Sequence, residues 1–81
     1  MRRYFFDTRD NAEFYPDEFG IRLRSLREAR QEAARCLSEM ARDLLENSVV
    51  RELEVEIRDE EGNALMRATL HFFVELTSPD R

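Results

Sequence analysis

Cysteine and histidine often supply nucleophiles, general bases and metal ligands, and this sequence holds one of each, Cys36 and His71. Cys36 lies near the edge of the apolar face of a predicted helix, whereas His71 points to the opposite face of a predicted sheet, so neither can activate the other. Two such residues are also too few for a zinc site. We expect Cys36 to be a small core residue, and we expect no catalytic, cofactor-binding or metal-binding residues.

The acidic residues and the glycines do not form a recognisable site either. Asp7, Asp10 and Glu13 are spaced too loosely for a calcium-binding loop. Two widely separated glycines cannot form a glycine-rich phosphate loop. Glu54 and Glu56 share one face of a predicted strand about 7 Å apart, which we interpret as a solvated surface. The sequence therefore predicts a protein that is not an enzyme.

Arginine has an unusual distribution, because the sequence has 13 arginines and no lysine. A basic cluster lies just before and within the predicted helix: Arg22, Arg24, Arg27 and Arg30, with Arg35 further along. Positive charge at a helix N-terminus opposes the helix dipole, so we expect a partner or an internal carboxylate to offset it. Arg30 falls inside the apolar arc of the helix, and its expected partner is Asp7, Asp10 or Glu18. Codon usage in a GC-rich genome is the favoured explanation of the arginine count, ahead of selection for bidentate contacts to carboxylate or phosphate.

The overall charge argues against a nucleic-acid partner. The formal net charge is −5, with an acidic C-terminal half. Glu28 and Glu32 also stand between the clustered arginines, so phosphate would be repelled.

The clearest structural element is a helix over residues 25–47. Ser25 and Glu28 have the spacing of a capping box. Apolar residues then recur with the i, i+3, i+4, i+7 spacing of one helical face. Asn47 is the expected stop, since asparagine tolerates a left-handed conformation.

A strand pair is predicted within residues 50–77. Residues 51–58 alternate strictly, so one face is apolar and the other is acidic. The apolar face consists of Leu53, Val55 and Ile57, and the acidic face consists of Glu52, Glu54 and Glu56. The return strand runs to about Leu76 and has the inward set Met66, Ala68, Leu70, Phe72, Val74 and Leu76. Residues that lie opposite each other share a face of the sheet, and a three-residue loop between the two strands would force Arg67 into the core. We therefore expect a loop of two or four residues. In the two-residue register Glu56 faces Arg67 and Glu52 faces His71.

A first strand pair is predicted within residues 1–24. Tyr4–Phe6 is a strand nucleus, and the return at Glu13–Tyr15 is interrupted by Pro16. Gly20 allows a second turn before Ile21–Leu23 leads into the helix.

Together these elements predict a single α+β domain of order ββαββ, a four-stranded antiparallel sheet with one long helix packed on one face. Residues 78–81 form a short tail. With the four predicted strands numbered in chain order, the orders 2-1-3-4 and 1-2-4-3 both make every pair of neighbouring strands antiparallel. The sequence does not decide between these two orders. No apolar run approaches the ~20 residues of a membrane span. A single cysteine excludes an intrachain disulfide, so we expect a cytoplasmic protein.

The open face of the sheet is the expected interaction surface. Phe73 lies on this face together with Arg67 and His71. Phe5 is expected to join Phe73 from the first strand and to make an apolar patch typical of an interface. The small core of an 81-residue chain also favours dimerisation.

Several segments resemble a large family of short proteins from GC-rich bacteria, known only as a domain of unknown function. They are Met1–Asp10, Pro16–Ile21, Ser25–Ala29 and Arg58–Gly62. The resemblance covers nearly the whole chain and implies a bacterial, cytoplasmic, single-domain protein, without implying an activity. A fainter likeness to the sheet domain of HicB-type antitoxins rests on Gly20 and Ser25–Ala29, although the loop motif of those antitoxins is missing here.

Two hypotheses follow. The first is a non-enzymatic protein–protein interaction module that forms a homodimer through its sheet edge or open face. The second is an antitoxin-like regulatory protein that neutralises a basic partner through its acidic hairpin, with Glu52, Glu54 and Glu56 among the contacts. Neither hypothesis involves a membrane, and the partner of the second is not identified.

Overall fold

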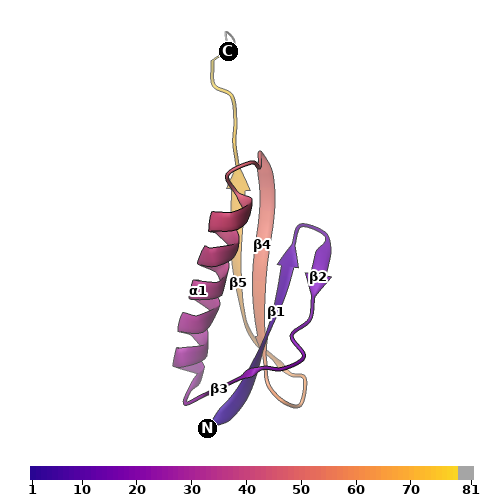
Figure 1. Cartoon of the computed structure of the whole chain (residues 1–81), viewed down its shortest axis with the longest axis vertical. Helices are drawn as coiled ribbons and strands as arrows, with labels where there is room; N and C mark the ends of the chain where they lie inside the picture. The colour runs from indigo at the N-terminus through magenta and orange to yellow at the C-terminus, as the bar shows by residue number, and fades with distance from the viewer. Residues whose placement is uncertain (79–81) are drawn as a thin grey trace.

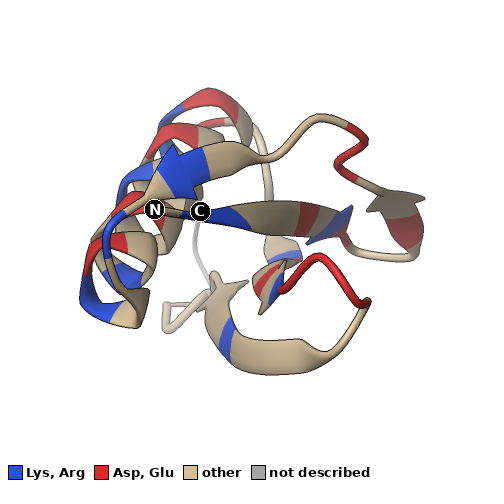
Figure 2. Ribbon diagram, turned by 90° about the horizontal axis from the view of Figure 1, so that it is seen from below, with Lys and Arg blue, Asp and Glu red and all other residues tan. Residues whose placement is uncertain are grey.

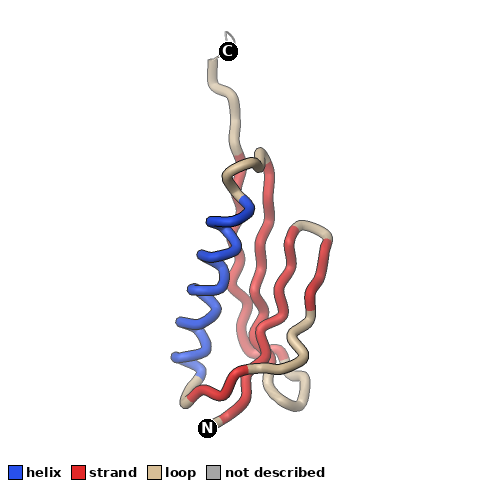
Figure 3. The backbone as a smooth tube through the Cα atoms, in the orientation of Figure 1, coloured by secondary structure: helices blue, strands red, loops and turns tan. Residues whose placement is uncertain are grey.

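The computed structural model describes residues 1–78 and has an α+β fold, with one helix and an antiparallel sheet of five strands (Figures 1 and 3). The elements are β1 (Arg2–Asp10), β2 (Glu13–Tyr15), β3 (Ile21–Leu23), α1 (Leu26–Leu44), β4 (Val50–Arg58) and β5 (Ala64–Phe73). The expected α+β class is confirmed. The expected order ββαββ with four strands is wrong, because residues 21–23 form the strand β3. No helix within residues 1–78 is long and apolar enough to cross a membrane.

Strand β1 accounts for the additional strand, because it is long enough to pair with two short strands along one edge. β2 pairs with Thr8–Asp10, and β3 pairs with Arg2–Tyr4. Between them, the N–H of Phe6 donates to Oδ2 of Asp17 at 3.0 Å, so a side chain fills the gap in the ladder. The other edge of β1 pairs with β4, which gives the order β2-β1-β4-β5. The predicted third and fourth strands correspond to β4 and β5. With β3 set aside, the observed order is therefore the expected order 2-1-3-4, and the order 1-2-4-3 is excluded.

The β4–β5 hairpin has the side-chain register that parity predicts, although its turn differs. Glu56 lies opposite Arg67, as expected. The turn instead closes with Asp59 opposite Asn63, whose carbonyl accepts the Asp59 N–H at 3.0 Å. The expectation of a two-residue or four-residue loop is therefore wrong. A β-bulge that leaves Leu65 without a partner on β4 restores the parity, so Arg67 stays out of the core.

The helix begins where the capping box predicts. The Ser25 hydroxyl accepts the N–H of Glu28 at 3.3 Å, and the Glu28 carboxylate accepts the N–H of the residue before Ser25 at 2.9 Å. The helix ends at Leu44, earlier than the expected stop at Asn47. The hydroxyl of Ser48 donates to the Leu44 carbonyl at 2.5 Å and so satisfies one of the terminal carbonyls.

The core lies between α1 and the inner face of the sheet. Leu53, Val55 and Ile57 of β4 are fully buried, as expected. The helix contributes Ala29 and Ala33, whose small side chains let α1 approach the sheet closely. The helix α1 lies over β4 and β5 (Figure 1), and β4 holds the most deeply buried side chains of the sheet.

The inward residues of β5 are buried less than expected. Met66, Ala68, Leu70 and Phe72 are half-buried, and Val74 and Leu76 are exposed. The strand ends at Phe73 rather than at Leu76. The strand ends there because β4 begins only at Val50. The carbonyl of Val49 still accepts the Val74 N–H at 2.7 Å, but residues after Val74 have no residue of β4 opposite them.

Candidate functional site at the edge of strand β5

Strand β5 forms one edge of the sheet, and no strand within residues 1–78 pairs with its far side. The N–H of Val74 points to β4, and bonded pairs alternate along an antiparallel ladder. Even-numbered residues of β5 therefore direct their backbone groups to β4, and odd-numbered residues direct theirs outward. The outward set, which we call the free edge, consists of Arg67, Thr69, His71 and Phe73. Such a row of unpaired donors and acceptors is a template for another strand.

A groove of about 320 Å³ runs beside the free edge, between β5 and α1. Ala33 and Ala34 line it from the helix, and Met66 and Ala68 line it from the strand. Three polar residues, Arg30, Gln31 and Arg67, also border it. Small side chains on the helix leave room for side chains from a second strand placed next to β5.

Arg30 pairs with none of its three expected partners. Asp7 is held by Arg58 at 2.7 Å, and Asp10 is held by Arg51 at 2.8 Å. Both cations come from β4, which lies directly beside β1, so these carboxylates are neutralised within the sheet. The expectation that Arg30 pairs with one of them is wrong.

Exposed apolar side chains gather where β4 begins and β5 ends. Phe73 and Leu76 are each 67% exposed, and Val74 is 49% exposed. Val50, at the start of β4, and Val49, just before it, are exposed as well. We call these five residues the apolar end. Grouped apolar exposure of this kind marks interaction surfaces more often than single exposed residues do.

Phe5 and Phe73 do not form the expected patch on the open face. Phe5 lies opposite Arg58, and Phe73 lies opposite Val50. These two positions are eight residues apart on β4, a distance of about 26 Å along a strand. The Arg58 guanidinium instead covers the Phe5 ring, with its Cζ 4.6 Å from the ring centre.

Charged residues on the open face neutralise one another. Arg67 contacts Glu56 at 3.0 Å and Glu54 at 3.5 Å, and Nδ1 of His71 lies 3.4 Å from Glu52. The structure therefore brings together five of the expected contact residues as internal pairs. The contacts of Arg67 draw its side chain over its own sheet and away from the free edge.

The expected basic cluster lies at one end of the molecule, where β3 meets the start of α1 (Figure 2). Arg22, Arg24 and Arg27 are exposed, and no carboxylate within residues 1–78 forms an ion pair with them. Arg35, one turn or more along the helix, pairs with Glu32 and, at 2.6 Å, with Glu39. The net positive part of the cluster is thus confined to the helix N-terminus.

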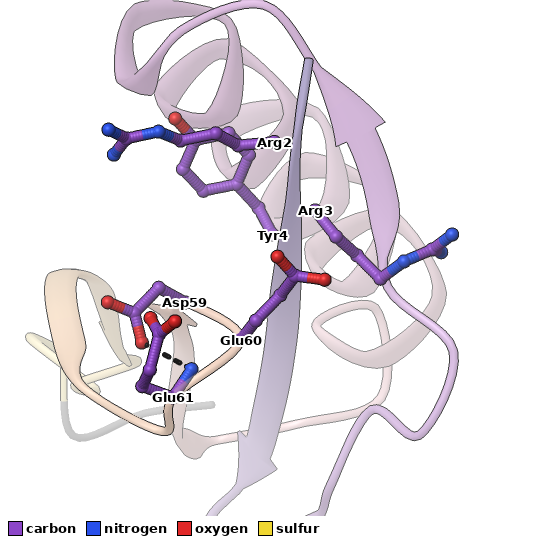
Figure 4. A pocket seen from close by; sticks show the side chains of 6 residues that line it. All are labelled: Arg2, Arg3, Tyr4, Asp59, Glu60 and Glu61. Atoms are coloured by element: carbon purple, nitrogen blue, oxygen red, sulfur yellow. Dashed lines mark hydrogen bonds between the residues drawn. The ribbon is translucent and has the colours of Figure 1, made fainter.

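A cleft of about 260 Å³ lies at the same end. Arg2, Arg3 and Tyr4 line one side, and the acidic β4–β5 turn, Asp59–Glu61, lines the other. Figure 4 shows the Arg2 side chain beside the Tyr4 ring, with the three carboxylates across the cleft. Its lining contains no serine, cysteine or histidine.

Sequence reasoning missed Asp17, which organises the loop between β2 and β3. Its carboxylate accepts backbone N–H groups from Phe6, Phe19 and Gly20 at 3.0 to 3.1 Å. Partial burial raises its pKa, but these three hydrogen bonds outweigh that effect and hold the pKa below its usual value. An aspartate three residues before a turn glycine was the signal that could have identified it.

Cys36 and His71 lie on opposite sides of the sheet. Cys36 is half-buried and packs against the core, where burial raises the pKa of its thiol. A thiol held neutral in this way is a poor nucleophile. Within the described part of the chain, no group of three or more His, Cys, Asp or Glu side chains is placed to hold a metal ion.

Comparison with known protein families gives a match over residues 3–71 to a domain of unknown function, DUF6894. The chain belongs to this family. The DUF6894 match runs from β1 into β5 and ends at His71, so three residues of the apolar end follow it. No curated protein and no solved structure gives a significant match.

Proposed function

We propose that this protein is a non-enzymatic interaction module that forms a homodimer by pairing the free edge of β5 with the same edge of a second copy. The observation that carries the proposal is the row of outward backbone groups from Arg67 to Phe73 beside an apolar groove. When two copies pair antiparallel about a twofold axis, each backbone donor of one edge meets an acceptor of the other edge. The helices of both copies then lie on the same face of the joined sheet.

The composition of β5 supports this choice of edge. Natural edge strands are usually protected by proline, by lysine or by a charge that points inward. Residues 64–73 contain no proline, no lysine and no acidic residue. Their one arginine, Arg67, is drawn over the sheet by Glu54 and Glu56. The opposite side of the sheet offers only β2 and β3, each three residues long.

The size of the domain supports dimerisation as well. A domain of 81 residues buries a smaller share of its surface on folding than a larger domain does, so its core contributes less stability. Pairing along β5 would cover the half-buried side chains of Leu70 and Phe72. The dimer would therefore extend the core across the interface.

The alternative proposal, an antitoxin-like regulator with an acidic hairpin, has less support. The three glutamates of β4 already face His71 and Arg67, although Glu52 stays exposed, and Glu60 and Glu61 of the turn are the other exposed acidic residues of the hairpin. A complex formed through that turn would dissociate as salt is raised. Pairing of β5 edges would persist in high salt, because it rests on backbone hydrogen bonds and apolar contacts.

A proline at Thr69 tests the proposal. Because the Thr69 N–H points outward, Thr69→Pro removes an edge donor while keeping every hydrogen bond to β4. In sedimentation equilibrium we expect a dimer for the wild type and for the control Thr69→Ala, in low and in high salt. Thr69→Pro should be a monomer with an unchanged circular dichroism spectrum. A monomeric wild type, or a folded Thr69→Pro dimer, would contradict the proposal.

A further inference from the structure

The chain continues beyond β5 as an extended segment, residues 74–78, which leaves the sheet at the end of the hairpin (Figure 1). Its sequence keeps the alternation of a strand, with Val74 and Leu76 on one side and Glu75 and Thr77 on the other. Within the described residues, the hydrogen bond from Val74 to Val49 is the last that joins it to β4. Residues 74–77 thus have the pattern of a strand, yet no strand formed within residues 1–78 lies beside them.

We infer that a second copy of this chain completes the segment, in a register centred on Phe73. The inference rests on the proposed dimer and specifies how its two edges meet. Residues 69–77 of one copy pair antiparallel with residues 69–77 of the other, and the twofold axis passes between the two Phe73 residues. The backbone groups of the odd-numbered residues point away from β4, so these residues must form the hydrogen-bonded pairs with the second copy. The register centred on Phe73 meets this requirement.

The facing side chains are complementary in this register. Apolar residues meet apolar residues on the helix side, and a carboxylate meets an imidazole on the open face. The pairs between the two copies are Val74 with Phe72, Leu76 with Leu70, Glu75 with His71, and Thr77 with Thr69. Every exposed apolar side chain of residues 73–76 gains a neighbour in the second copy.

The register centred on Thr69 fits less well, although it would use the whole of β5. It places Arg67 of one copy opposite His71 of the other, so neither basic side chain meets a carboxylate of the second copy. It also places Val74 opposite Ala64, the small first residue of β5, and Leu76 opposite Gly62 in the β4–β5 turn of the second copy. The concentration of exposed apolar side chains at the apolar end therefore selects the axis at Phe73.

Disulfide trapping distinguishes the two registers. In a Cys36→Ala background, Phe73→Cys places two thiols across the proposed axis, where paired Cα atoms lie about 5.5 Å apart. Thr69→Cys places them about 26 Å apart in the same register. Under mild oxidation we expect Phe73→Cys to form a covalent dimer rapidly and Thr69→Cys to remain uncrosslinked. Mixing a Glu75→Cys chain with a His71→Cys chain should give a covalent heterodimer, which tests the register with Phe73 intact.

The outcomes separate the register from the dimer itself. Cross-linking at Thr69 rather than at Phe73 would overturn the register, while the proposed dimer would stand. A Cys36→Ala parent that sediments as a dimer but cross-links at none of these positions would overturn the register as well. A wild-type chain that sediments as a monomer would overturn both.

Discussion

Arg58 and Asp7 form an ion pair in which the carboxylate is almost fully buried. Nε of Arg58 donates to Oδ2 of Asp7 at 2.7 Å, and Asp7 is only 5% exposed. Oδ1 of Asp7 accepts the N–H of Asp17 at 2.8 Å, and Nη2 of Arg58 donates to the Asp17 carbonyl at 2.8 Å. The pair therefore joins β1, β4 and the loop between β2 and β3.

Removal of the cation from this pair should destabilise the fold strongly. Arg58→Met leaves the Asp7 carboxylate buried without a counter-charge, so we expect a loss of about 3 kcal/mol in the free energy of unfolding. The control is Arg35→Met, which removes an exposed helix pair and should cost much less, because solvent screens such pairs. Urea denaturation measures both values. Equal losses would show that the Asp7 pair has no special structural role.

Asp17 should make the stability of the protein sensitive to acid. Its folded-state pKa lies below its unfolded value of about 3.9. Its contribution is therefore complete above that value and is lost as the pH falls through the folded-state pKa. We expect Asp17→Asn to be less stable than the wild type at pH 7 and to lose less stability on further acidification. The measurement is the melting temperature of both proteins at a series of pH values. Parallel curves of melting temperature against pH would contradict the prediction.

The two glycines should differ in their tolerance of a side chain. Both have a positive φ, +74° at Gly20 and +88° at Gly62, so alanine costs about 1–2 kcal/mol at either site. A Cβ at Gly20 would also lie 2.8 Å from Cγ of Arg3 and 3.0 Å from the Tyr4 carbonyl oxygen, whereas nothing lies within 4 Å at Gly62. Gly20→Ala should therefore lower the melting temperature more than Gly62→Ala. The reverse order in calorimetry would contradict the close packing of this loop.

Cys36 should react slowly with alkylating reagents. Burial raises the pKa of its thiol, so little thiolate is present at neutral pH. We expect iodoacetamide to label the native protein much more slowly than the urea-unfolded chain at pH 7.5, as followed by mass spectrometry. Comparable rates would show that the thiol is accessible and unperturbed.

The hairpin and the helix could be predicted because local patterns determine them. Leu53, Val55 and Ile57 are buried as their alternation indicates, and Ser25 caps the helix as its spacing from Glu28 indicates. Strand β3 could not be predicted in the same way. Three residues carry little pattern, and they form a strand because β1 extends far enough to pair with them.

The candidate site could be predicted only in part. The sequence shows that Phe73 lies on the outer face of a strand, but the distance between Phe73 and Phe5 depends on how β1 is placed along β4. The outward direction of the Thr69 backbone likewise depends on which pairs of the hairpin are hydrogen-bonded. That alternation is set by the bulge at Leu65 and by the tight turn, neither of which the side-chain pattern reveals.

The interrupted ladder beside β1 has a consequence for how far assembly can proceed. A sheet with two continuous edges can add copies at both sides and grow into a fibre. Here one side consists of two three-residue strands, with the Asp17 carboxylate filling the gap between them. A dimer joined at β5 would present only these broken sides to its surroundings. Growth would therefore stop at two copies, and the loop held by Asp17 would act as a terminator of polymerisation.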